Sequence, residues 1–375
     1  MLLVRKSAVF TLLAVALGLF FVPFEGVCCT SWMVFSDLTG NGTNILHKNR
    51  DSASRKVFIS SSEPGAKLKW ISLGSGGANI GFNSSGLAGC MNSGEKCSDP
   101  PSVEGKKSTP KMLQVILAEC NSAAQAVAKL RQFVKDGDYS HGQRGSIFLF
   151  MDSHEGYICE ITAKVCTAQH FNSNYTVRAS VWHNPLMYQY SREEFEIYLK
   201  ASSRAYIAIS GLNRMLDETG KITLPGIFEH SRHHIPPKKS PFNRSICGKT
   251  TNSAASIEID KEYPQVLSTM YAAIGHPRHT VYVPIPIVTE YIPPIMKNRK
   301  WSMTAYKRLD ELDLNSPIPE EWTKFEKESM ASYTKAKADA RKLLAAGKSA
   351  EAAALLNFTA KKIWKKAAVM LNIVK

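Results

Sequence analysis

Residues 29–51 read CTSWMVFSDLTGNGTNILHKNRD, and this stretch decides the fold. Two apolar runs, at residues 30–37 and 44–49, flank the segment LTGNGT at residues 38–43. Glycine and asparagine in a short segment between two apolar runs are a strong turn signal. The stretch therefore predicts a β-hairpin that brings Asp51 back beside Cys29.

The 28 residues before this hairpin have the pattern of a signal peptide. Arg5 and Lys6 form a short cationic region, and an apolar run follows at residues 7–21. That run is shorter than the roughly 20 residues needed to span a bilayer. Cleavage before Cys29 puts small residues, Gly26 and Cys28, at the −3 and −1 positions. We therefore expect export to a secreted, periplasmic or lumenal location, a mature chain that begins at Cys29, and no transmembrane span in that mature chain.

The rest of the chain alternates between strand and helix patterns, which predicts an α+β fold. Residues 29–100 and 250–285 are strand-rich, and residues 146–166 predict a hairpin with DSHEG as its turn. Residues 109–134 predict two helices, the second capped by Asn121 or Ser122. Residues 192–216 are helical in pattern and residues 220–248 are loop-like. From Pro319 onward, two amphipathic patterns separated by Gly347 predict a helical pair. The expected division is a signal peptide at 1–28, a catalytic domain at 29–318 and a helical appendage at 319–375.

A cysteine at a mature N-terminus carries two useful groups. Its thiol is a nucleophile, and its α-amine, with an ordinary pKa of about 8, can serve as the adjacent base. This pairing suits acyl transfer from an amide through an acyl-enzyme. The alternative interpretation is that Cys29 is a structural disulfide cysteine.

Four segments resemble the N-terminal nucleophile (Ntn) hydrolases that act on linear amides, a group that includes choloylglycine hydrolases and isopenicillin N acyltransferases. They are Cys29-Thr30 with Asn49-Arg50-Asp51, IGFNSSGLAGCMNSG at residues 80–94, VWHNP at 181–185, and TTNSAASIEID at 250–260 with GHPRHTVYVPI at 275–285. The last segment is similar to a dipeptidase branch. The resemblance covers about residues 29–290 and implies a four-layer αββα sandwich followed by the C-terminal helical hairpin.

The resemblance also implies roles for individual side chains. Cys29 is the expected nucleophile, Asp51 holds its amine, and Asn92 donates to the oxyanion. Asn184 orients the substrate amide or the amine. Arg50 or Lys48 favours the thiolate electrostatically. Lys48, Asn83 and Arg244 are the expected substrate-binding residues. The choloylglycine branch carries arginine where Lys48 stands, and its late arginine corresponds to Arg244 or Lys249.

The eight cysteines and five Asn-x-Ser/Thr sites suggest an exported glycoprotein with disulfides. Cys90/Cys97 and Cys159/Cys166 have spacings that suit local pairs, which leaves Cys120/Cys247 as the long-range pair. Spacing alone leaves the connectivity open. The cluster of His230, His233 and His234 lies in a proline-rich segment without a nearby acidic cluster, so the sequence predicts neither a metal nor an organic cofactor.

A formal charge of +15 favours contact with anionic surfaces, and the export signal argues against nucleic acid. The expected function is hydrolysis of a small acylated amide or short peptide. A dipeptidase or an acyltransferase of the same superfamily is an alternative. A non-catalytic cationic binding protein is the alternative from another class.

Overall fold

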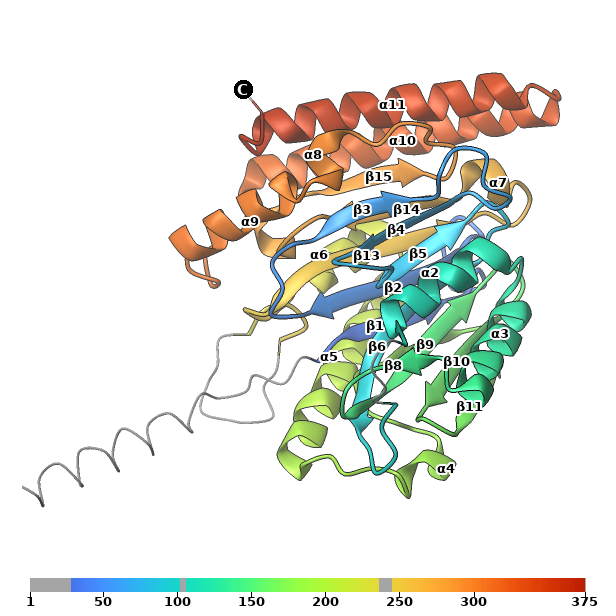
Figure 1. The fold of residues 1–375 in the computed structure, drawn as a ribbon. Helices are drawn as coiled ribbons and strands as arrows, with labels where there is room; N and C mark the ends of the chain where they lie inside the picture. Colours follow the sequence, from blue (N-terminus) through green and yellow to red (C-terminus); the bar gives the residue numbers. More distant parts are fainter. Residues whose placement is uncertain (1–27, 102–105, 236–244, 375) are drawn as a thin grey trace, which may run out of the picture.

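A computed structural model describes residues 28–101, 106–235 and 245–374, and it contains two large antiparallel sheets (Figure 1). The first, six-stranded sheet has the order β12 (Tyr175–Arg178), β1 (Thr30–Val34), β2 (Asn44–Asp51), β13 (Thr251–Ile259), β14 (Thr269–Ala273) and β15 (Tyr282–Pro286). The second, seven-stranded sheet has the order β11 (Cys166–Phe171), β10 (Gly156–Ile161), β9 (Arg144–Met151), β6 (Ala88–Lys96), β5 (Ile80–Asn83), β4 (Trp70–Gly74) and β3 (Phe58–Ser61). A short parallel pair joins β7 (Lys107–Ser108) to β8 (Tyr139–Ser140).

The two sheets face one another through their central strands, β1 and β2 of the first sheet against β6 and β9 of the second. Strand β9 is buried on both faces. Ile147 and Leu149 belong to the core between the sheets, whereas Phe148 and Phe150 belong to a second core on the far side. Successive side chains of a strand point to opposite faces, so a continuous apolar run is what a doubly covered strand requires.

Two helices, α2 (Thr109–Glu119) and α3 (Ala123–Asp136), supply that second core and pack on the outer face of the seven-stranded sheet. The side chain of Ser122 accepts a hydrogen bond from the backbone N–H of Gln125 at 3.3 Å. This is the N-cap interaction expected before α3. The expected hairpin also forms, with β9 and β10 joined at residues 152–155.

The other outer face belongs to α5 (Phe195–Thr219), which packs on β1 and β12, and to α6 (Leu224–Ser231), which packs on β13. The prediction of a loop over residues 220–248 is wrong where α6 forms. Thr223 caps this helix by accepting from the N–H of Gly226, and Pro225 lies in its first turn. A threonine N-cap with a proline in the first helical turn is a helix-start signal. The loop-like composition of the surrounding residues is the reason that the sequence predicted a loop.

The predicted C-terminal pair is α10 (Glu320–Ala345) and α11 (Ser349–Met370), which lie side by side along β15 (Figure 1). The indole N–H of Trp364 donates to the carbonyl of Pro284 at 2.7 Å, and the backbone N–H of Tyr282 donates to Glu326 at 2.6 Å. The hairpin is thereby bonded to the edge strand of the six-stranded sheet. The remaining helical segments are α4 (Pro185–Tyr188), α7 (Pro264–Leu267), η1 (Pro277–His279), α8 (Pro294–Lys297) and α9 (Lys300–Glu311).

The predicted mixture of helices and antiparallel sheets is confirmed. The expected signal peptide lies outside the described residues except for Cys28. No helix in the described part of the chain is long and apolar enough to cross a membrane.

No disulfide links any of the eight cysteines, which all lie in the described part of the chain as free thiols. Of the predicted pairs, Cys159 and Cys166 are in side-chain contact on the neighbouring strands β10 and β11, whereas the other two pairs do not meet. Cys90 lies within β6 and Cys97 directly follows it. Seven residues of extended chain span about 20 Å, whereas a disulfide needs Cα atoms about 4–7 Å apart. Cys120 belongs to the core under α2 and α3, whereas the Cys247 sulfur lies 3.8 Å from the Nε2 atom of His276.

Candidate active site

The β1–β2 hairpin places Cys29 beside the end of β2, as the sequence predicts. Thr30 pairs with Asn49 in the register of the two strands, so Cys29, one residue earlier, meets the Arg50–Asp51 end of β2. The Cys29 sulfur lies 3.8 Å from the backbone carbonyl oxygen of Asp51. Both residues are almost completely buried, with 5% and 2% of their surfaces exposed. The thiol and the carboxylate therefore share one enclosed corner of the protein.

Arg50 adds a positive charge to this corner. Burial lowers the pKa of the Arg50 guanidinium, while the neighbouring Cys29 and Asp51 act in the opposite direction. The Nη2 atom donates to the hydroxyl of Ser75 at 2.9 Å. The Nη1 atom is buried and has no hydrogen-bond partner among the described residues. One face of the guanidinium is thus free to interact with a thiolate or with a bound substrate.

The Asp51 carboxylate is held by two residues from distant parts of the chain. Thr251, at the start of β13, donates its hydroxyl to Oδ1 at 2.7 Å. Arg204, on α5, donates to Oδ2 and also to the carbonyl of Ile246, the latter at 2.6 Å. Burial alone would lower the pKa of Arg204, but the charges of Asp51, Cys28 and Cys29 raise it above its ordinary value. Arg204 is therefore the buried cation of this site.

Sequence reasoning missed Arg204 and named Arg50, Lys48, Arg244 and Lys249 instead. A signal was present, because Arg204 lies on the stripe of α5 that also carries Ala201, Ala205, Ala208 and Leu212, all of them buried. A charged residue in the apolar stripe of an amphipathic helix needs a buried partner.

Asn92 reaches the hairpin from the opposite sheet. Its Oδ1 atom accepts from the hydroxyl of Ser31 at 2.9 Å and from the ammonium group of Lys48 at 2.5 Å. Its Nδ2 atom has one long contact, 3.3 Å, to the carbonyl of Arg178. Since two donors fix the oxygen end, the nitrogen end is the part of the amide with a hydrogen left to donate.

Lys48 lies behind Asn92 and is 1% exposed. Its ammonium group also donates to the carbonyl of Met91 at 2.7 Å. Burial raises the pKa of nearby Cys90 to about 11, and the charges of both Lys48 and Cys29 act on that thiol. Lys48 and Cys29 are therefore both close enough to Cys90 for their charges to influence the pKa of its thiol. Through these contacts Lys48 holds the oxygen end of the Asn92 amide.

A buried imidazole supports the hairpin from the side of α6. His47 stacks on Trp32 with ring centroids 4.0 Å apart and bonds to Ser256 and Asn49, each at 2.8 Å. Burial lowers the pKa of His47 to about 3, so it is neutral at ordinary pH. Asn49 continues this network by donating to the carbonyl of Ser231 at 2.7 Å. The network fixes β2 against the last turn of α6.

The structure does not bring Asn184 into the hydrogen-bonded group around Cys29. Its side chain caps α4 by accepting from Leu186 at 3.0 Å, and its backbone N–H donates to the buried carboxylate of Glu160 at 3.0 Å. Among the described residues, no hydrogen bond joins Asn184 to Cys29, Asp51 or Asn92.

Asn83 has a structural position. Its amide donates to the carbonyls of Leu117 and Cys120 and accepts from the N–H groups of Ser85 and Leu87. The side chain thus makes four hydrogen bonds and is 0% exposed, so it is a fixed part of the β5–β6 turn. Arg244, the other expected substrate-binding residue, lies outside the described residues.

No group of three or more histidine, cysteine, aspartate or glutamate side chains in the described parts of the chain is arranged to hold a metal ion. The His230 ring instead fills a space against Gly211 of α5. Burial lowers the pKa of His230 to about 4, with the charge of His233 as the next contribution.

Comparison with known proteins adds a likeness in fold. Neither the protein-family models nor the curated proteins compared with the sequence give a match. Among solved structures, two variants of conjugated bile acid hydrolase from Clostridium perfringens are similar, each with 12% identity over 70% of this chain and TM-scores of 0.44 and 0.46. These matches cover 93% and 94% of the two hydrolase chains. Penicillin V acylase from Agrobacterium tumefaciens has 15% identity over 69% of this chain and 86% of its own, with a TM-score of 0.41. At these values the likeness concerns fold only, and the reaction has to be argued from the side chains.

Proposed function

We propose that the protein is an exported amidase of the Ntn type, with the four-layer αββα architecture and with Cys29 as its N-terminal nucleophile. One observation carries the proposal. A cysteine, a buried carboxylate and an arginine with an unpartnered N–H meet at Cys29, Asp51 and Arg50, and the amide of Asn92 comes from the opposite sheet to bond Ser31, two residues after Cys29. The solved structures similar in fold are described as a bile acid hydrolase and a penicillin acylase, which are amide-cleaving enzymes by name.

The mechanism starts with removal of residues 1–28, which turns the Cys29 nitrogen into an α-amine. Asp51, itself held by Arg204 and Thr251, accepts a hydrogen bond from this amine and orients it. The amine takes the thiol proton, and the thiolate attacks the substrate carbonyl carbon. Asn92 donates its free amide hydrogen to the oxyanion that forms. The amine then gives the proton to the leaving nitrogen as the C–N bond breaks, and an acyl-enzyme results.

Water completes the reaction. It loses a proton to the Cys29 amine as its oxygen attacks the thioester carbonyl, and the thiol is regenerated when the carboxylic acid leaves. Cys28 packs beside the backbone of Ser180 and the charge of Arg204, and burial raises the pKa of its thiol. Removal of Cys28 would therefore open space beside Arg204 for the acyl part of a substrate.

The test uses the exported protein and its intact mass. We expect a chain that begins at Cys29 and gains an acyl mass when it is mixed with a panel of acylated amides that includes acyl-amino acids, phenoxyacetyl amides and dipeptides. Cys29→Ala should gain no mass, whereas Cys28→Ala, the matched control, should still be processed and acylated. An active protein that begins at Thr30, or that retains the Cys28–Cys29 bond, would overturn the mechanism.

A second measurement tests Asn92. Replacing one oxyanion donor lowers turnover by about 100- to 1,000-fold. We expect Asn92→Ala to fall in this range on whichever amide acylates Cys29, while Ser93→Ala, its neighbour on β6, stays within about threefold of the unmodified protein. Equal turnover for Asn92→Ala and the unmodified protein would remove Asn92 from the site.

A further inference from the structure

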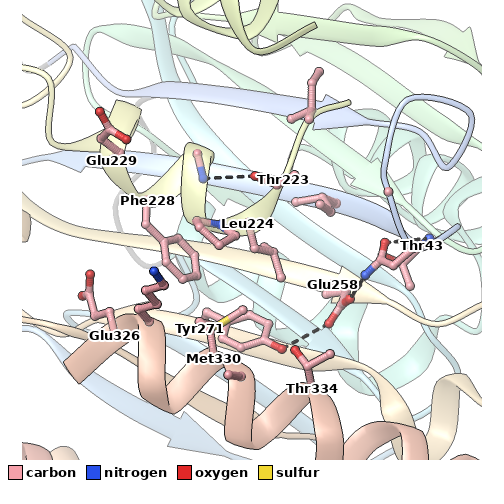
Figure 2. Close-up of a pocket in the computed structure, with 18 of the residues that line it drawn as sticks. Thr43, Thr223, Leu224, Phe228, Glu229, Glu258, Tyr271, Glu326, Met330 and Thr334 are labelled. Carbon is pink, nitrogen blue, oxygen red and sulfur yellow. Dashed lines mark hydrogen bonds between the residues drawn. The ribbon is translucent and has the colours of Figure 1, made fainter. Parts of the chain in front are cut away.

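A cavity of about 1210 Å³ lies on the helix-covered face of the six-stranded sheet, between α6 and α10. Ile45 of β2, Glu258 of β13 and Tyr271 of β14 contribute to its floor. Figure 2 shows Leu224 and Phe228 of α6 on one side, and Met330 and Thr334 of α10 on the other, with Tyr271 between them. Small-molecule sites in proteins have this concave form and volumes of about 300–1,000 Å³.

This cavity is separate from the proposed active site. It contacts β2 at Ile45, whereas the active site uses Asp51, six residues further along the same strand. It contacts β13 at Glu258, whereas Thr251 lies at the opposite end of that strand. At about 3.3 Å per residue, both separations are about 20 Å. At the other end of the cavity Arg232 follows Ser231, whose carbonyl accepts from Asn49 of β2. The lining contains none of Cys29, Arg50, Asp51, Asn92 and Arg204, so the cavity and the proposed active site share no residue among these.

Ion pairs hold the walls of the cavity in place. Arg232, at the end of α6, binds Glu326 of α10 through two hydrogen bonds of 2.6 and 2.7 Å. Lys337 of α10 binds Glu258 at 2.5 Å, and Arg341 of α10 binds Asp260. These contacts fix α10 to α6 at one end of the cavity and to β13 at the other. The space between the helices is consequently part of the folded structure and does not need a ligand to form.

The buried acids of the lining have their charges satisfied. Both oxygens of Glu258 accept hydrogen bonds, from Asn41 and Thr43 on one side and from Tyr271 and Lys337 on the other. Asp260 and Glu326 have basic partners and backbone N–H partners as well. Four basic and four acidic residues line the cavity, so the formal charge of its lining is zero although the chain carries +15. These residues are Arg232, Lys327, Lys337, Arg341, Glu229, Glu258, Asp260 and Glu326. Such a lining complements an uncharged ligand.

The cavity extends along α10. The residues that α10 contributes run from Thr323 to Arg341, which is about 27 Å along a helix. The apolar residues Ile45, Ile222, Leu224, Phe228 and Met330 lie in its lining. The hydroxyl of Thr323, at one end of this range, offers a hydrogen bond to a polar end group. An extended hydrocarbon chain with an uncharged hydroxylated end matches this length, polarity and charge.

From these features we infer that the protein has a second, non-catalytic site that binds an uncharged single-chain lipid of the monoacylglycerol or fatty-alcohol class. The hydrocarbon chain lies along α10 over Tyr271, and the hydroxylated end meets the hydroxyl of Thr323. The inference does not depend on the proposed amidase activity.

The test is a fluorescence titration of the full protein with Nile red, an uncharged apolar dye, followed by competition with glycerol monolaurate. We expect saturable dye binding that glycerol monolaurate displaces. Laurate, which has the same chain and a carboxylate, should compete about tenfold more weakly, and glycerol should not compete. A difference of tenfold corresponds to about 1.4 kcal/mol.

Two tryptophan variants locate the site. Ala331 lines the cavity, so Ala331→Trp should fill it and weaken both dye and lipid binding by at least about tenfold. Ser332 is exposed and lies outside the lining, so Ser332→Trp should change binding by less than about twofold. If circular dichroism shows that Ala331→Trp does not fold, Ala338→Trp is used in its place. Ala338 also lines the cavity, seven residues further along α10.

Cys29→Ala separates this proposal from the proposed function. Unchanged lipid binding by Cys29→Ala supports a site apart from the catalytic corner. The inference is refuted by non-saturable dye uptake in the unmodified protein, by equal binding in folded Ala331→Trp and Ser332→Trp, by tighter binding of laurate than of its glycerol ester, or by loss of binding in Cys29→Ala.

Discussion

Replacing Arg204 with methionine tests whether the Asp51 corner is held by a buried ion pair. The guanidinium and the carboxylate are 7% and 0% exposed at their side chains. The change removes the charge opposite Asp51 and leaves the carbonyl of Ile246 without its 2.6 Å donor, while Thr251 remains as the one side-chain partner that the described residues provide. Breaking one side of a buried pair costs about 3–5 kcal/mol of folding free energy. We expect a loss of that size for Arg204→Met.

The assay is urea denaturation of the full chain at pH 7, in a double-mutant cycle with Asp51→Asn. Because Asp51→Asn removes the unpaired charge, the double variant should be more stable than Arg204→Met, with a coupling of about 2 kcal/mol or more. The matched control is Arg214→Met on the same helix. Arg214 is 57% exposed and lies 4.0 Å from Glu218, so this change should cost less than about 1 kcal/mol. Equal losses for Arg204→Met and Arg214→Met, or strictly additive effects of Arg204→Met and Asp51→Asn, would refute the buried pair.

Three further predictions concern two buried histidines, a helix glycine and a helix cap. Burial lowers the pKa of His47 and His276 to about 3 from 6.5, so the unfolded chain takes up protons first and stability falls as the pH drops from about 6.5 towards 3. Urea midpoints at pH 7.5 and 5 check this; an unchanged midpoint contradicts it. Gly211→Ala should destabilise the protein although alanine favours a helix, because the new Cβ would lie 2.1 Å from the His230 ring; a raised melting temperature would show that the ring moves away freely. Ser122→Ala should cost about 1 kcal/mol through loss of the α3 cap, measured by the same urea titration, and an unaltered midpoint would mean that water replaces the cap.

The parts of the site that the sequence predicts are those that local structure brings together. The LTGNGT turn and the apolar runs beside it predict the β1–β2 hairpin, and the hairpin alone brings Cys29, Arg50 and Asp51 together. The helix caps and the C-terminal pair are local patterns of the same kind. The contact of Asn92 with Ser31 joins two different sheets, and its location in the sequence followed from the resemblance of residues 80–94 to a known family.

The parts that sequence reasoning missed depend on contacts between distant residues. Arg204 is 153 positions after Asp51, and Thr251 is 200 positions after it. The position of Arg204 on the apolar stripe of α5 signals a buried partner, but spacing along the chain carries no information about which residue that partner is. The predicted pair Cys90/Cys97 failed for a related reason, because a spacing that suits a loop places two residues about 20 Å apart when the chain is a strand. Cys159 and Cys166, with the same spacing, are in contact because a tight turn joins their strands β10 and β11.

The bonding of the C-terminal helices to β15 has a consequence for assembly. Residues 282, 284 and 286 occupy alternate positions along β15, so their backbone groups face the same side of the strand. The carbonyl of Pro284 accepts from Trp364 of α11, so this side faces away from β14. Two of the three are prolines without an N–H, and the N–H of Tyr282 is occupied by Glu326. A strand from a second copy would therefore meet no free donor along this edge. The six-stranded sheet is closed to β-augmentation through β15, and any association of copies must use another surface.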